Sequence, residues 1–386
     1  MRLIRLIALM GLMACSTEQE ELASEPQTTP ETSIAITFSG QQVTEEQITR
    51  GGNGTYGSTR AGTPLNEAGV TNFKVWGYKN NVYEGGSYGG LQIVFPGYNV
   101  KWTANSAATT TTNSNGWEYV AQQESGDEQT IKYWDWGTMA YRFFAVAGVD
   151  GSDEANGTYA FTMTANASPV RSGEGTAEEK TAANIADAPY FSRLWFSTGV
   201  LPTYADKQFG RPVLLEFLKP FARVRFLFNY SYAAEGVKLS TPVFKPTSDF
   251  AEPPAEPVGI ALTGTVKVSY PLTGTATKES YTSTPKASPT EGETLEAFTE
   301  EYIPEGTEKW YTVLPRTSQG SYTLSVNING ATKKAVVPAE YMTWLPGYSY
   351  TYIFKITDLG GVEIDLVQTA VTNWSEMEGD YSVYNW

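Results

Sequence analysis

Apolar and polar residues alternate along many short stretches of this 386-residue chain, and glycine-containing pairs separate the stretches. Successive side chains of a β-strand point to opposite faces, so a period of two predicts strands with one buried face and one solvent-facing face. The clearest stretches are 221–230, 322–328, 348–357 and 362–366. Gly85-Gly86 and Asn156-Gly157 are typical hairpin turns. The pattern predicts an all-β fold with little helix, and only 176–188 favours a short helix.

The composition limits the chemistry that such a fold can carry. The chain has 24 Tyr, 17 Phe and 10 Trp, which favour strands, but it has no His and a single Cys. Ser-His-Asp and Cys-His nucleophiles, zinc sites and disulfide scaffolds are thereby excluded. The formal charge of −15 repels phosphate backbones, so nucleic acid is disfavoured as a partner. Carboxylate chemistry and calcium binding remain open.

The amino terminus has the layout of an export signal. Arg2 and Arg5 precede an apolar run that ends in Leu12-Met13-Ala14-Cys15. This ending resembles the bacterial lipobox, so we predict a signal peptide over 1–14 and a lipid on Cys15. The alternative is an ordinary Cys near a conventional cleavage site. The acidic stretch 16–21 resembles the signal that sends some lipoproteins to the outer face of the outer membrane, and a solvated acidic tether explains it equally well.

A lone strand follows a flexible tether. Residues 16–33 carry Ser, Thr, Glu, Gln and Pro with hardly an apolar group, which is too little burial to offset chain entropy. Ile34, Ile36 and Phe38 then alternate with small polar residues, before a polar, glycine-rich linker over 41–62. A single strand is not stable by itself, so we expect this one to pair with the edge of a sheet formed farther on.

The length predicts about two domains, and a polar, turn-rich stretch over 202–212 separates two strand-rich halves. We expect two β-sandwiches in series, with long surface loops over 248–257 and 282–294. The predicted segments are a signal peptide (1–14), a tether with the lone strand and a cleavable linker (15–60), an N-terminal β-sandwich (61–205) and a C-terminal β-sandwich (206–386).

Three groups of residues are candidate chemical sites. The glycine spacing of 52–57 matches a dinucleotide-binding loop, but no helix follows it, so we interpret it as a linker. The acidic turn with Asp150, Asp153, Glu154 and Asn156 offers oxygens to calcium, but a solvated hairpin explains it better because no bidentate Glu closes the loop. Glu300 and Glu301 are adjacent and have no marked partner, so a glycosidase pair is disfavoured.

A dense aromatic cluster lies at Tyr133-Trp134-Asp135-Trp136. Surface Trp and Tyr stack on sugar rings, so carbohydrate binding is one interpretation. Alternate residues of a strand point to opposite sides, so at most half of the cluster can face a ligand, and core packing is the favoured interpretation.

Taken together, the lipobox, the tethered lone strand, the linker with Arg residues and the two strand-rich halves resemble the fimbrillin family, the subunits of type V pili in Bacteroidetes-like bacteria. One departure is Lys219-Pro220, where a His often follows the Leu-Glu-Phe stretch in the family pattern. The motifs that carry the resemblance are Ile131-Lys132-Tyr133-Trp134-Asp135, Tyr141-Arg142-Phe143-Phe144-Ala145, Leu215-Glu216-Phe217, Ala222-Arg223-Val224, the stretch from Trp344 to Tyr352, and Val371-Thr372-Asn373-Trp374.

The resemblance implies two transthyretin-like sandwiches with Greek-key-type connections, and no cofactor. It also implies export as a lipoprotein and cleavage after an Arg by an outer-surface protease, which removes the first strand. We assign the cleavage to Arg60, with Arg50 as the runner-up, and the removable plug strand to Ile34, Ile36 and Phe38. The opened groove then accepts a strand from a neighbouring subunit. Val362, Ile364 and Leu366 alternate like the plug and form the candidate donor strand; Tyr381 and Val383 alternate less convincingly.

The leading hypothesis is therefore a structural, non-enzymatic subunit of a surface fimbria at the cell outer membrane, either in the shaft or at an adhesive tip. Its expected partners are other pilus subunits, the outer membrane through the lipid anchor, an Arg-specific protease and a host or bacterial surface ligand. The alternative is a surface carbohydrate-binding lipoprotein, which has no use for a plug strand followed by an accessible Arg. A carboxylate glycosidase is a distant third.

Overall fold

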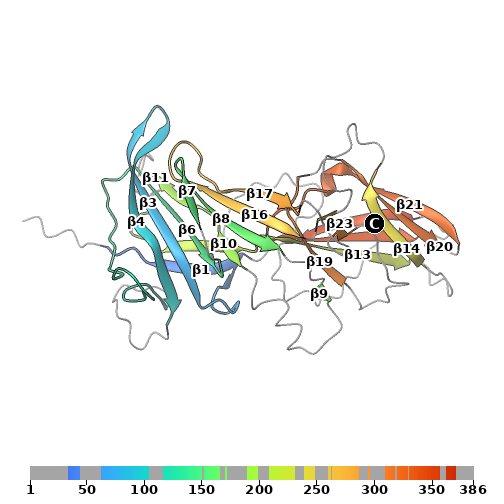
Figure 1. Cartoon of the computed structure of the whole chain (residues 1–386), viewed down its shortest axis with the longest axis horizontal. Coiled ribbons are helices and arrows are strands. Elements are labelled where there is room, and N and C mark those ends of the chain that lie inside the picture. The colour runs from blue at the N-terminus through green and yellow to red at the C-terminus, as the bar shows by residue number, and fades with distance from the viewer. Residues whose placement is uncertain are drawn as a thin grey trace, which may run out of the picture. The chain divides into compact units, whose positions relative to one another are not determined.

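The computed structural model describes residues 34–43, 62–103, 116–149, 152–165, 170–171, 189–198, 208–230, 239–247, 260–261, 263–286, 294–295, 309–317, 320–328, 330–356 and 362–370. These residues form β-strands joined by turns, and their one helical element is the 3₁₀ turn η3 (Ala339–Tyr341). The predicted all-β class is confirmed (Figure 1). Within the described ranges, no helix is long and apolar enough to cross a membrane. The helix expected over 176–188 and the loop expected over 248–257 lie outside the described residues.

A nine-stranded sheet holds the first strand of the chain. Its strand order is β2-β1-β12-β10-β6-β3-β4-β5, and β11 also pairs with β6. β6 is buried at every position, as expected of a strand covered on both faces, because apolar residues occupy both of its alternating sets. The bounds are β1 Phe38–Val43, β2 Gly62–Pro64, β3 Asn72–Glu84, β4 Ser87–Trp102, β5 Trp117–Glu118, β6 Ala140–Ala147, β10 Tyr190–Ser192, β11 Trp195–Thr198 and β12 Val213–Leu218.

A four-stranded sheet has the order β17-β16-β8-β7, with β7 Asp153–Ala155, β8 Thr158–Ala165, β16 Gly264–Pro271 and β17 Ser280–Pro285. The predicted Asn156-Gly157 turn joins β7 to β8, and Gly85-Gly86 joins β3 to β4. β17 corrects the loop expected over 282–294: its Thr, Ser and Tyr residues form a strand along β16, because ladder hydrogen bonds offset their low hydrophobicity.

The remaining strands confirm the clearest alternating stretches. A five-stranded sheet has the order β23-β22-β13-β19-β9, a three-stranded sheet has the order β14-β20-β21, and β15 pairs with β18. The bounds are β9 Val170–Arg171, β13 Ala222–Tyr230, β14 Leu239–Pro246, β15 Ile260–Ala261, β18 Thr294–Leu295, β19 Lys309–Val313, β20 Tyr322–Ile328, β21 Ala331–Val337, β22 Ser349–Ile356 and β23 Val362–Ala370.

Two apolar clusters form the core of the described residues. One contains Ile36 and Phe38 together with side chains of β3, β4, β6 and β12. The other extends from Trp76 and Phe144 to Trp344 and Phe354. Pairing also joins the two predicted halves, because β10 lies along β12 and β8 lies along β16. The division at 205/206 and the transthyretin-like topology stay predictions.

Candidate functional site: the groove that holds the first strand

The first strand of the chain lies within the nine-stranded sheet, between β2 and β12. β1 pairs in parallel with β12, with Phe38 opposite Val213 and Gln42 opposite Phe217. It pairs antiparallel with β2, with Gln41 opposite Pro64. The expectation that this strand pairs with a sheet formed farther on is confirmed. The strand is expected over Ile34 to Phe38, but β1 covers Phe38–Val43, so it begins at the last expected residue and extends into the expected linker; before it, Ala35 makes an isolated bridge to Tyr133.

The inward side chains of this segment are fully buried. Ile36 and Phe38 are 0% and 1% exposed, whereas Ile34 is 41% exposed and lies outside the buried row. The ring of Phe38 meets three others edge-on, with centroid distances of 5.0 Å to Phe95, 5.8 Å to Phe143 and 6.0 Å to Tyr119. We call the segment 34–43 the plug, and the space that it fills the plug groove.

Both sides of the groove also hold the plug backbone. The N–H of Ile36 donates to Lys132 O at 2.8 Å, and Thr37 O accepts from Val213 N at 2.8 Å. The hydroxyl of Tyr119 donates to Ile36 O at 3.0 Å and accepts from Lys132 N at 3.1 Å. Burial raises the pKa of Tyr119 to about 12, so this hydroxyl keeps its proton at neutral pH. Tyr119 thus links the plug to the opposite wall.

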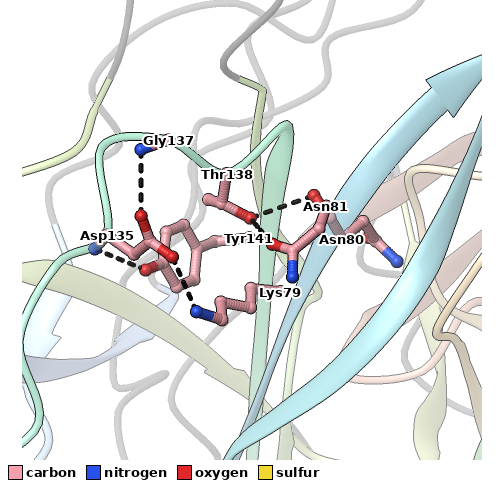
Figure 2. A network of polar contacts seen from close by, with 7 residues as sticks. All are labelled: Lys79, Asn80, Asn81, Asp135, Gly137, Thr138 and Tyr141. Atoms are coloured by element: carbon pink, nitrogen blue, oxygen red, sulfur yellow. Dashed lines mark hydrogen bonds and ion pairs between the residues drawn. The ribbon is translucent and has the colours of Figure 1, made fainter.

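A polar network anchors that wall, the segment 131–139, to β3 (Figure 2). Asp135 pairs with Lys79 at 2.6 Å and accepts from Gly137 N at 2.9 Å. The hydrogen bond from Lys79 lowers the pKa of the Asp135 carboxyl. The Thr138 hydroxyl contacts Asn80 O at 3.0 Å, and Tyr141 Oη accepts from Asp135 N at 2.8 Å. Lys132, which holds Ile36, is therefore part of a segment fastened at several points.

The aromatic cluster within this wall divides between core and surface. Trp134 is 5% exposed and stacks on Phe209 with ring centroids 5.4 Å apart, so core packing is confirmed for it. Tyr133 is 49% exposed, and its backbone bridges to Ala35 of the plug. Trp136 also packs against Phe209. One member of the cluster is thus free to face solvent.

The third inward residue of the plug is Gly40, and the groove has little space for a side chain at this position. A Cβ atom built on Gly40 would lie 3.1 Å from Leu65 Cδ2 and 3.4 Å from Phe217 Cε2. Leu65 and Phe217 are both 0% exposed. At the fourth inward position Gln42 is buried, and its Oε1 has no hydrogen-bond partner.

The other predicted site residues are distributed as follows. Cys15, Arg50 and Arg60 lie outside the described residues, as do 52–57, Asp150, Glu300 and Glu301. Asp153 and Glu154 are exposed on β7 beside the Asn156-Gly157 turn, which confirms the hairpin interpretation. Among the residues with described positions, no three acidic, Cys or His side chains are grouped to hold a metal ion.

The candidate donor residues Val362, Ile364 and Leu366 lie on β23 and pair with β22 of their own chain. The register shifts between Ile353 and Phe354, so Ile364 pairs with Phe354 but Leu366 pairs with Ile353. This bulge interrupts the strict alternation in the intact subunit. The donor role stays a prediction.

Sequence reasoning did not single out Leu65, Tyr119 or Phe217 as groove residues. Leu65 is an isolated apolar residue between Pro64 and Asn66, so no periodicity marks it. Lys132 and Phe217 belong to motifs that carry the family resemblance, but neither motif marks them as groove residues. The sequence signal for Tyr119 is its place in an aromatic, acidic run that begins at Trp117.

No protein-family model and no curated protein sequence matches the chain. Among solved structures, it is similar to a proposed cell adhesion protein from Bacteroides uniformis at 11% identity and a TM-score of 0.35, covering 88% of this chain and 97% of that one. It is similar to a fimbrial assembly protein from Parabacteroides distasonis at 12% identity and a TM-score of 0.29, covering 85% and 98%. A proposed polysaccharide-binding protein from Bacteroides thetaiotaomicron gives 10% identity and a TM-score of 0.29, covering 76% and 86%. Likeness at this level does not establish function.

Proposed function

We propose that this chain is an exported structural subunit of a surface fimbria, in which residues 34–43 are a removable plug and the plug groove accepts a strand from a neighbouring subunit. The observation that carries the proposal is that Ile36 and Phe38 of the plug are buried and that β1 lies between β2 and β12 in the sheet. Such a strand can separate from the sheet, because its covalent connection to the other strands is the polar, glycine-rich stretch that follows it.

Removal of the plug creates an acceptor site. The backbone groups of Lys132 and Val213 lose their partners in the plug, and the pockets for Ile36 and Phe38 become empty. Each pocket residue contributes about 1.5–3 kcal/mol by burial, so an open groove favours any strand that refills it. Main-chain hydrogen bonds then give affinity, and the alternating pockets give register.

Maturation follows from the sequence features outside the described ranges. The lipid on Cys15 anchors the precursor to the outer membrane, facing outward. An Arg-specific protease cuts after Arg60, or after Arg50 as the second choice, and frees the chain from its anchor together with the plug. The mature subunit then joins other subunits in a fimbria that supports adhesion. It acts without a cofactor and is not an enzyme.

β23 is the candidate donor. It is the terminal strand in the order of its sheet, and within the described part of the chain it pairs with β22 alone. A terminal strand can leave without separating two other strands. Val362, Ile364 and Leu366 then supply the apolar residues that the groove of the next subunit needs.

The test is to cut the purified full-length chain at Arg60 and to follow polymers by electron microscopy and mass. The cut chain is expected to polymerise, and the double variant Arg50→Ala, Arg60→Ala treated in the same way is the matched control that stays monomeric. A chain truncated before Gly361 is expected to remain monomeric after the cut. Equal polymerisation by the truncated chain would exclude β23 as the donor, and absence of polymer from the cut intact chain would contradict self-assembly.

Carbohydrate binding at the surface is the second candidate, and exposed Tyr133 is the observation that favours it. A glycan binder keeps its plug and its anchor. Glycan-array binding by the uncut chain that is lost in Tyr133→Ala would support this function over the fimbrial one.

A further inference from the structure

The third inward residue of the plug is glycine for reasons of space. Gly40 does not belong to the glycines with positive φ, so its backbone conformation is open to other residues. Its missing side chain is what matters, because a Cβ would lie 3.1 Å from Leu65 Cδ2 and 3.3 Å from Leu65 Cβ. A larger residue at this position requires Leu65 to move.

The plug itself holds Leu65 in place. The N–H of Leu65 donates to Gly40 O at 2.9 Å, and the pairs of neighbouring β2 are all made with β1. On its other side, Leu65 O accepts from Val70 N at 3.0 Å within a turn. Loss of the plug therefore removes the strand partner of β2 and one backbone bond of Leu65, while the turn remains.

The candidate donor matches the plug at every inward position except this one. The plug presents Ile36, Phe38, Gly40 and Gln42, and β23 carries Val362, Ile364, Leu366 and Gln368 at the same spacing. The first two residues are large and apolar in both strands, and the fourth is Gln in both. Leu366 falls on the position that Leu65 closes in the intact chain.

Resting on the proposed function, we propose that Leu65 is a gate coupled to cleavage: with the plug in place its side chain crowds the position of Gly40, and after the cut it moves aside for a large apolar residue. The occupant of the open groove is then β23 of a second copy of this chain, with Leu366 in the enlarged third position. The groove of the intact subunit thus holds the plug, and the groove of the cut subunit accepts β23 of another copy. The intact subunit resists invasion by a donor, because the donor would meet Leu65 held in place.

The first experiment uses the intact full-length chain. Gly40→Leu is expected to lower the denaturation midpoint strongly, and its cost should be at least halved in a Leu65→Ala background. Leu214→Ala is the matched control, because Leu214 lies on β12 beside the plug but is 41% exposed. An equal cost of Gly40→Leu in all three backgrounds would overturn the assignment of Leu65 as the gate.

The second experiment uses the full-length chain with a site-specific protease sequence inserted before Ala61. After the cut, synthetic peptides covering 362–370 compete with the plug fragment, and mass spectrometry measures the concentration that displaces half of it. The wild-type peptide is expected to displace the plug at a concentration about ten- to a hundredfold lower than the L366G peptide, since a buried Leu side chain contributes that much. An isotope-labelled plug peptide checks that the groove exchanges its occupant.

The outcomes separate the two proposals. Tighter binding of the L366G peptide would mean that the third inward position of the groove still favours glycine after the cut. The assignment of Leu65 as a gate would then be wrong, while strand acceptance would stand. If neither β23 peptide nor the labelled plug peptide exchanges into the cut chain, the groove is not an acceptor, and the proposed function fails together with the gate.

Discussion

Shortening Phe38 to alanine is expected to destabilise the intact protein by about 3–5 kcal/mol, the range for deleting a buried Phe ring. The upper part of this range applies because Phe38 is 1% exposed and touches three aromatic rings. Each edge-to-face pair adds about 0.5–1.5 kcal/mol beyond its buried area. Phe95 and Phe143 belong to the long paired strands β4 and β6, which limits collapse into the cavity.

Guanidinium denaturation followed by tryptophan fluorescence measures the total cost. Hydrogen exchange of the amides of 38–42 measures the local opening free energy, and this readout holds even where sheets unfold in separate steps. Ile34→Ala is the matched control, since it lies on the same segment but is 41% exposed, and its cost should stay within about 0.5 kcal/mol. Equal costs for the two variants would refute the burial of the plug as described.

Further substitutions test the sheet, the wall and the anchor. Gly77→Ala places a Cβ 2.6 Å from Phe143 Cε1 and should cost about 1–3 kcal/mol in thermal unfolding, whereas Gly89→Ala, with nothing within 4 Å, should be neutral. Asp135→Asn removes the pair with Lys79, worth less than about 1 kcal/mol because Asp135 is 45% exposed. The hydrogen bond from Lys79 lowers the pKa of the Asp135 carboxyl, so this stabilisation is full above about pH 4 and is lost as pH falls through the folded-state pKa. The difference in unfolding between wild type and Asp135→Asn should therefore shrink as the pH is lowered. Cys15→Ala should abolish labelling by a palmitate analogue and release the chain from membranes; persistent labelling would contradict the lipobox.

Alternation along the chain predicts most of the strands, because burial on one face needs no knowledge of the partner strand. It identifies β13, β20 and β22 within one or two residues at each end. It fails for β17, whose polar residues form a strand only because β16 lies beside them. Strand formation there depends on a distant segment, and a pattern of neighbouring residues does not contain that information.

The residues of the plug groove are predictable to the same extent: alternation along the chain is informative, and contacts between distant segments are not. The inward positions of Ile36 and Phe38 follow from alternation, but the exposure of Ile34 does not, because it depends on where the groove ends. Leu65 acquires its role through contact with Gly40, and it directly follows β2, a strand of three residues that is too short to show a periodicity. Tyr119 acts through a hydroxyl that reaches the plug backbone across the sheet. These contacts are non-local, so only the structure brings them together.

The place of β1 in the sheet bears directly on the proposed strand exchange. β1 is near the start of the chain but has a neighbour on both sides in the strand order, β2 and β12. Its bond with β12 is parallel, and parallel neighbours require a long connection, so no short hairpin loop fixes β1 to that strand. A single cut in the linker would therefore remove the covalent link between the plug and the rest of the sheet, while its hydrogen bonds and buried side chains still hold it. An incoming strand that takes its place regains backbone partners on β12 and at Lys132, and the exposed sheet edge is covered again. While the linker is intact the plug is held at high effective concentration, which disfavours exchange. Under the proposed function, the same geometry keeps the precursor closed before the cut and leaves the subunit able to accept a strand after it.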